Sequence, residues 1–322
     1  MIEITTLEVS GFTGAIKGMR NPLKNRDKSD SGPWMAVSDK LDLSDPYTEA
    51  LQYWDEEFGL NMIIGPKDLE LCQKLLRTNK DDDSKFMRMI HVQADVNAPL
   101  YWWKEYDTYK ISTVANSEST MHTIHKREFD IRDFAHDALL DNYSLDDVFD
   151  DEAYSTPDDL LIDTIMTLNQ LRKLYLQAVE EKKDAEAKDY WYNMIQLLPT
   201  SYMQKRTIDL NYQTLRRIWF ARKGHKLSEW QGFRDWIMEL PYAEELISYK
   251  PAGYFGFDSE KFYNNVKKLR EEGKTDAEIC DMFAMTTGYF RTVYSHSARI
   301  AKEKAYERRS SDNPDSGQES NG

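Results

Sequence analysis

The chain has 322 residues, of which 40% are hydrophobic and 12% aromatic, enough for a sizeable core in one large domain or two smaller ones. No run of roughly eighteen apolar residues occurs, which excludes a membrane span, and the free thiols Cys72 and Cys280 fit a reducing cytoplasm. A net charge of −14 argues against non-specific nucleic-acid binding by the protein as a whole.

Alternating and helical patterns follow each other in the first hundred residues. Residues 1–8 alternate apolar and polar side chains, which predicts a strand rather than a signal peptide. Leucines and Cys72 recur at helical spacing over residues 66–78 and predict a helix. Residues 87–96 alternate again and predict a strand with Ile90, Val92 and Ala94 on one face. Pro99 then suits the start of a second helix.

The segment from Asn97 to His122 is unusually dense in hydroxyls, charges and aromatic rings. Its last eleven residues offer many hydrogen-bond donors and acceptors, which suit a phosphate, a pyrimidine ring or the edge of a flavin. The alternative is a solvated turn, because Ser, Asn and Thr are common turn residues. Both interpretations stay open at this point.

A helical region comes after an acidic segment. Asp141 to Glu152 lacks the calcium-loop pattern, so a solvated acidic face is expected there and no metal site. Thr156 and Pro157 make a strong helix start, followed by apolar residues at three- and four-residue steps. Further helices are predicted over residues 189–197 and 211–221.

The C-terminal part resembles a helix-turn-helix. Gly273 is a good helix end, the residues from Thr275 to Glu278 form a capping box, and a third helix is expected after Thr286. From Thr286 to Arg309 the chain has six Lys or Arg against two acids, enough to approach DNA phosphates. A helical protein-interaction module is the alternative. Residues 310–322 are polar and predict a disordered tail.

The order of several motifs resembles the flavin-dependent thymidylate synthases over roughly residues 1–245. The motifs are Lys85-Phe86, Asn97-Ala98-Pro99, the hydroxyl-rich segment, Leu198-Pro199, and Asn211 followed by Arg222. The resemblance implies an α+β fold of helices around a small sheet. With the C-terminal part it gives a synthase-like domain over 1–250, a helix-turn-helix over 255–309 and the tail over 310–322.

The resemblance also implies site residues. Ser119 matches the family's substrate-contacting serine, Asn211 a flavin-contacting asparagine and Arg222 the dUMP-binding arginine. Lys110 keeps one positive charge where Thr108-Tyr109-Lys110 replace the family's Arg-His-Arg, and Met121 replaces another arginine. We therefore expect Lys110, Ser119 and Arg222 to bind or polarise the nucleotide. The residues expected to contact the cofactor are Asn116, Glu118, Asn211 and His122.

The family's activity is the reductive methylation of dUMP to dTMP. Its cofactor is FAD, and NADPH and methylenetetrahydrofolate are co-substrates. A homotetramer in which several subunits build each site is expected, in the cytoplasm and with no membrane partner. The departures leave two alternatives open. One is a catalytically inactive, nucleotide-binding or DNA-binding regulator from a phage or mobile element, and the other is an interaction protein whose hydroxyl-rich segment is structural.

Overall fold

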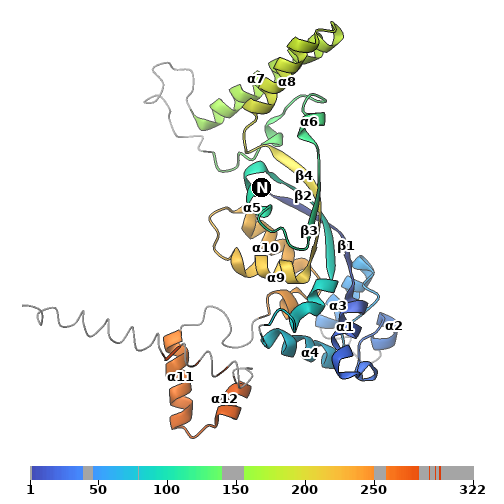
Figure 1. Ribbon diagram of the computed structural model, residues 1–322, viewed down its shortest axis with the longest axis vertical. Helices are drawn as coiled ribbons and strands as arrows, with labels where there is room; N and C mark the ends of the chain where they lie inside the picture. Colours follow the sequence, from blue (N-terminus) through green and yellow to red (C-terminus); the bar gives the residue numbers. More distant parts are fainter. Residues whose placement is uncertain are drawn as a thin grey trace, which may run out of the picture. The chain divides into compact units, whose positions relative to one another are not determined.

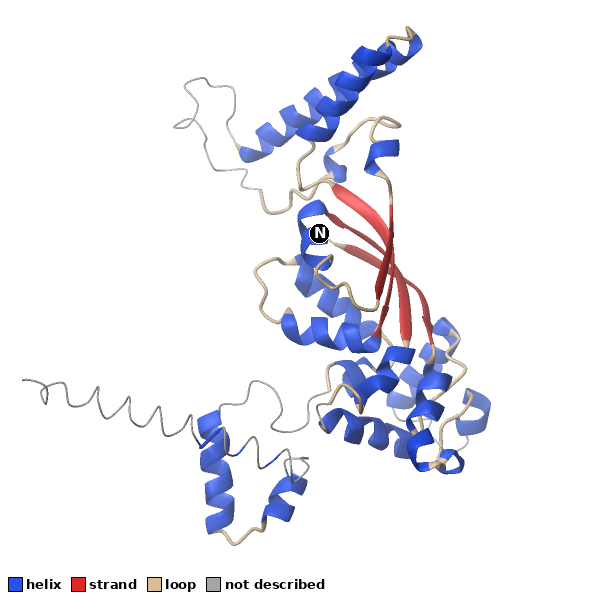
Figure 2. Cartoon of the chain, in the orientation of Figure 1, coloured by secondary structure: helices blue, strands red, loops and turns tan. Residues whose placement is uncertain are grey.

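The computed structural model describes residues 2–38, 46–78, 80–139, 156–249 and 259–282, together with residues 290, 294, 297 and 298. Within them, helices and a four-stranded antiparallel sheet confirm the predicted α+β class (Figures 1 and 2). The chain divides into two compact units, residues 1–11, 57–60 and 88–241, and residues 12–56, 61–87 and 242–322. No helix in the described part of the chain is both long enough and apolar enough to cross a membrane.

The sheet is the centre of the first unit. Its strands lie in the order β1-β2-β4-β3, and their bounds are β1 Glu3–Ser10, β2 His91–Pro99, β3 Thr113–Ser117 and β4 Met203–Asn211. The N-terminal strand is confirmed, whereas the second strand begins later than predicted because Ser84–Met89 form a 3-10 helix, η4. The consecutive residues Phe86 and Met87 of this helix are both buried.

Three helices cover one face of the sheet, as Figure 1 shows: α5 (Leu100–Tyr106), α9 (Tyr212–Ala221) and α10 (Glu229–Glu239). Val92, Ala94 and Val96 of β2 are fully buried on this side, as the alternation predicts. The helices add an aromatic cluster in which the Trp102 ring lies 4.8 Å from Trp230. This cluster forms the core beneath the sheet.

A long helical hairpin belongs to the same unit and consists of α7 (Pro157–Glu180) and α8 (Asp184–Leu197). The Thr156 hydroxyl accepts the Asp159 N–H at 3.2 Å, so the predicted cap is confirmed. The hairpin's apolar face packs against the segment after β3, which contains α6 (Thr120–Thr123) and the 3-10 helix η5 (Ile131–Asp133). The buried residues of this second core are Ile124, Phe129, Phe134, Leu161, Ile165, Leu168 and Met194. The acidic segment Asp141 to Glu152 lies outside the described residues.

The second unit is helical. Its elements are α1 (Phe12–Met19), η1 (Asn21–Leu23), η2 (Arg26–Lys28), α2 (Trp34–Val37), α3 (Pro46–Phe58), α4 (Pro66–Arg77) and the π-helix η6 (Ala243–Ile247). The helix predicted over residues 66–78 is confirmed as α4. The fully buried Asp68 carboxylate accepts from Arg20 Nε and from the hydroxyls of Ser29 and Ser31. Three donors satisfy this buried charge. The network therefore joins Arg20, Ser29 and Ser31 to α4.

The C-terminal helices are α11 (Ser259–Glu271) and α12 (Asp276–Met282). Gly273 has φ +83°, and the N–H of Lys274 donates to the carbonyl of Leu269, which is the expected helix end. The predicted capping box is present, because Glu278 and Thr275 each accept the other's backbone N–H. Most of the predicted third helix, the boundary near residue 255 and the tail 310–322 lie outside the described residues.

Candidate functional site

The uncovered face of the sheet is polar. On β2 the side chains that alternate with the buried ones are His91, Gln93, Asp95 and Asn97, and all are at least partly exposed. On β4 the matching positions are Lys205, Thr207 and Asp209. Because antiparallel pairing sets these residues opposite one another, their side chains form cross-strand pairs on one surface. This surface carries the candidate site.

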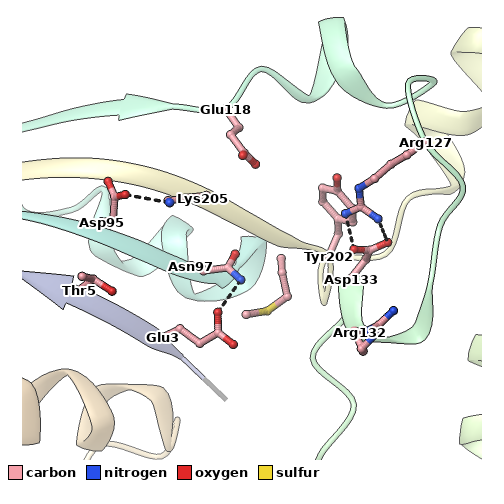
Figure 3. Close-up of a pocket in the computed structure, with 11 residues that line it drawn as sticks. Glu3, Thr5, Asp95, Asn97, Glu118, Arg127, Arg132, Asp133, Tyr202 and Lys205 are labelled. Atoms are coloured by element: carbon pink, nitrogen blue, oxygen red, sulfur yellow. Dashed lines mark hydrogen bonds and ion pairs between the residues drawn. The ribbon is translucent and has the colours of Figure 1, made fainter.

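A pocket of about 270 Å³ lies at one end of this face (Figure 3). Three strands, the residue after β3 and the turn around η5 all contribute to it. The lining residues are Glu3, Thr5, Asp95, Asn97, Glu118, Arg127, Arg132, Asp133, Tyr202, Met203 and Lys205. Three cations and four carboxylates therefore meet in one hollow, which suits a ligand that has both an anionic group and hydrogen-bond donors.

The two arginines are held by a compact turn. Arg127 donates to both Asp133 oxygens, at 2.7 Å from Nη1, and Asp133 also accepts the Asp130 N–H at 2.8 Å. Arg132 Nε lies 2.7 Å from the Asp130 carboxylate, yet its side chain is 85% exposed. The turn is anchored to α7, because the Asn169 side chain exchanges two hydrogen bonds with the backbone of Phe129. Both guanidinium groups thus stay near the pocket with donors to spare.

Lys205 is fixed by its neighbours on the sheet. Its ammonium lies 2.8 Å from Asp95, and Thr207 donates to the other Asp95 oxygen at 2.7 Å. The hydrogen bonds from Lys205 and Thr207 hold the pKa of Asp95 below its usual value. The same ion pair raises the pKa of Lys205. The lysine therefore remains charged at neutral pH and its position is defined.

Glu118 and Tyr202 complete the pocket. The Glu118 carboxylate makes no hydrogen bond or ion pair with any residue that the structure describes. Burial and the nearby Asp133 carboxylate raise the pKa of Tyr202, so its hydroxyl is neutral and available as a donor. The Tyr202 ring packs edge-on against Phe129 and Phe134. The two residues also line a second hollow of about 290 Å³ beside the first.

The structure places the predicted cofactor residues at different points. Asn116 is exposed on β3, and His122 is exposed on α6, while Glu118 lines the pocket. Asn211 is buried, and its side-chain oxygen accepts the Thr214 N–H at 2.9 Å as the cap of α9. The structure therefore brings only Glu118 into the pocket and gives Asn211 a structural partner.

The predicted nucleotide-binding residues are also separated. Ser119 and Lys110 are exposed, and neither lines the pocket. Arg222 is 15% exposed at the end of α9, where Nη1 lies 2.7 Å from Glu105 and Nε donates to the Tyr109 hydroxyl at 2.8 Å. Its guanidinium also lies 4.3 Å from the Trp230 ring. These partners satisfy much of the donor capacity of Arg222 within the fold.

Of the eleven residues that line the pocket, the sequence predicted only Glu118 as a site residue, and the missed residues include Arg127, Arg132, Tyr202 and Lys205. The strand that contains Lys205 was missed because two of its four residues on the covered side, Gln204 and Arg206, are polar. The alternation of β4 is therefore weak. Arg206 is tolerated there because its guanidinium lies over the Trp103 ring at 4.2 Å.

No protein-family model matches the sequence, and no curated protein does. Several solved structures are similar to this chain. Thymidylate synthase X (ThyX) from Helicobacter pylori, with FAD and dUMP, has 14% identity and a TM-score of 0.46, over 77% of this chain and 97% of that one. A UMP/dUMP methylase, PolB from Streptomyces cacaoi, bound with 5-Br dUMP, has 13% identity and a TM-score of 0.40, over 77% and 95%.

Proposed function

We propose that this protein binds a pyrimidine nucleotide in the pocket at the end of the sheet, and that it methylates dUMP reductively to dTMP with FAD. The pocket carries the first part of the proposal. It combines three cations, the Tyr202 ring and the unpaired Glu118 carboxylate in one hollow, and Glu118 belongs to the hydroxyl-rich segment. The order of the sequence motifs supports the second part.

Each chemical part of a nucleotide has a matching group in the pocket. A phosphate would bind at Arg127, Arg132 and Lys205, through charge-assisted hydrogen bonds. The Tyr202 ring offers a flat surface for the base, and the Glu118 carboxylate can accept from a base N–H or a ribose hydroxyl. The three cations already pair with carboxylates of the protein, so the charge of a phosphate alone does not account for binding. An uncharged hydrogen-bond donor on the ligand therefore matters as much as its phosphate. A nucleotide fits this balance better than a bare anion does.

The residues expected to contact a flavin fit it in part. Asn116, Glu118 and His122 are exposed along one segment, and their side chains have no hydrogen bond to the described residues. They could hold FAD through hydrogen bonds, whereas the oxygen of Asn211 is already the cap of α9. When bound, the reduced flavin supplies hydride. The protein's own task would be to orient the base and exclude water beside it.

One observation favours a second candidate, a nucleotide-binding regulator without catalysis. Tyr109 stands where the family has the histidine of Arg-His-Arg, and its hydroxyl accepts a hydrogen bond from Arg222. The site would then lack several of the family's cationic contacts, because Arg222 is held by Glu105 and Trp230. In this candidate, nucleotide binding regulates DNA binding by the C-terminal module.

Purified full-length protein separates the candidates. The first predicts flavin absorbance after purification and tritium release from dUMP labelled at carbon 5, in the presence of methylenetetrahydrofolate and NADPH. The second predicts dUMP binding by calorimetry with no tritium release. Colourless protein that shows no heat of binding with dUMP and no thermal shift with FAD would refute both, and the polar pocket would then be a solvated surface.

A further inference from the structure

The turn between α1 and α2, in the blue part of Figure 1, presents a cluster of cations. Residues 21–28, here called the basic turn, contain Lys24, Arg26 and Lys28 against the single acid Asp27. All three cations are exposed, and none of them forms an ion pair with a residue that the structure describes. The C-terminal helices differ, because a carboxylate lies within 3.9 Å of each of Lys267, Lys268, Arg270 and Lys274. The basic turn is therefore a local positive region on a chain of net charge −14.

Both ends of the basic turn are tied to one buried carboxylate. Arg20 precedes the turn and Ser29 follows it, and both donate to the fully buried Asp68 of α4. Within the turn, Arg26 Nε donates to the side-chain oxygen of Asn21 at 2.5 Å. Because these bonds hold the backbone in one conformation, the turn loses little conformational entropy when it binds a partner.

The tip of the basic turn displays an apolar side chain. Lys24 has φ +50°, a left-handed conformation that is uncommon for residues other than glycine. Such conformations persist only where the surrounding structure imposes them, and they are concentrated at functional sites. Leu23 directly before it is 79% exposed, and Pro22 is exposed too. The turn thus holds one large apolar side chain in solvent beside three unpaired cations.

We propose that the basic turn binds duplex DNA in the minor groove, with Leu23 against a base step and the three cations on the flanking phosphates. Proteins that bind this groove combine cations with an apolar wedge such as leucine or proline. The narrow groove of A·T-rich sequences also has an enhanced negative potential. An anionic membrane fits less well, because an interfacial anchor needs a whole apolar helix face and the basic turn has a single large apolar residue. This contact is separate from the C-terminal module and does not rest on the proposed reaction.

The salt dependence of DNA binding tests the cations. Full-length protein is titrated into a short, labelled, A·T-rich duplex at several salt concentrations, and binding is measured by fluorescence anisotropy. Lys24→Asn combined with Lys28→Gln removes two cations, and asparagine tolerates the left-handed conformation at residue 24. Each lost phosphate contact reduces the slope of log K against log salt by about 0.9, so this double variant should lose about 1.8. Lys173→Gln combined with Lys223→Gln removes the same charge from two other exposed positions and should leave the slope unchanged.

The apolar contact has a separate test. Leu23→Ala should weaken DNA binding about 3- to 30-fold with an unchanged salt slope, because it removes apolar surface and no charge. The minor-groove dye DAPI should compete with the native protein for the duplex. Thermal melting checks that every variant folds.

Several outcomes would overturn the proposal. They are the absence of salt-dependent DNA binding, a slope that the double variant at Lys24 and Lys28 leaves unchanged, and an equal loss of slope in the control pair. Native affinity in Leu23→Ala would also overturn it. Binding to phosphatidylglycerol vesicles without binding to DNA would do the same and would identify a lipid surface as the partner.

Discussion

Replacing Arg222 by alanine distinguishes a structural role for this residue from a ligand-binding one. The substitution removes the charge-assisted bond to Glu105, which contributes about 1.5 kcal/mol because Glu105 is 39% exposed and partly screened. It also removes the cation–π contact with Trp230 at 4.3 Å, which contributes about 1–2 kcal/mol at this largely buried position. We expect a loss of about 2–4 kcal/mol of stability, and a melting temperature lower by about 5–15 °C.

The assay measures the affinity for dUMP by calorimetry and the melting temperature of the same samples. Arg222→Ala should melt earlier and bind dUMP as the native protein does, at a temperature where both are folded. Lys223→Ala is the matched control, because it removes an exposed charge from the next residue and should change neither quantity. Affinity reduced more than tenfold with an unchanged melting temperature would refute the structural reasoning and make Arg222 a ligand group, as the family resemblance implies.

Arg132→Ala should weaken dUMP binding by about 1.5–3 kcal/mol with no loss of stability, because the side chain is 85% exposed; calorimetry showing equal affinities would remove Arg132 from the site. Lys205→Met should raise the lowered pKa of Asp95 towards its ordinary value. The ion pair between Lys205 and Asp95 stabilises the native state above the ordinary pKa of Asp95, and this stabilisation is lost as the pH falls through the lowered pKa. An NMR titration in which the Asp95 pKa is the same in the variant would contradict this ion pair. Gly273→Ala should cost about 1–2 kcal/mol at φ +83°, and an unaltered denaturation curve for the C-terminal helices would argue against a strained turn.

Local signals predicted the elements whose ends are set by short-range chemistry. The Thr156 cap with Pro157, the helix after Pro66 and the capping box at Thr275 all lie where the sequence indicates. In each case one turn of chain contains both the signal and its hydrogen-bond partner. For the same reason, the sequence correctly predicted that α11 ends just before Gly273.

The candidate site could not be predicted in the same way, because tertiary packing assembles it. Arg127 lies in the turn before η5, which Asn169 of α7 anchors through Phe129, 40 positions earlier in the chain. Lys205 reaches the pocket through a strand whose pattern is obscured by Gln204 and Arg206. Glu118 was predicted from the family motif, and it is the one predicted site residue that lines the pocket. Whether Asn116, Ser119 and His122 contact a ligand remains a prediction.

The aromatic cluster beneath the sheet gives the first unit an optical signature. Trp102 lies 4.9 Å from Trp103 and 4.8 Å from Trp230, with the rings strongly inclined to one another. Indoles this close couple electronically, so these three residues of one core should contribute to the near-ultraviolet dichroism band of the protein. That band vanishes when fixed packing is lost while helices persist. It can therefore report on the packing of the core beneath the sheet, beside the pocket that is proposed to bind the nucleotide.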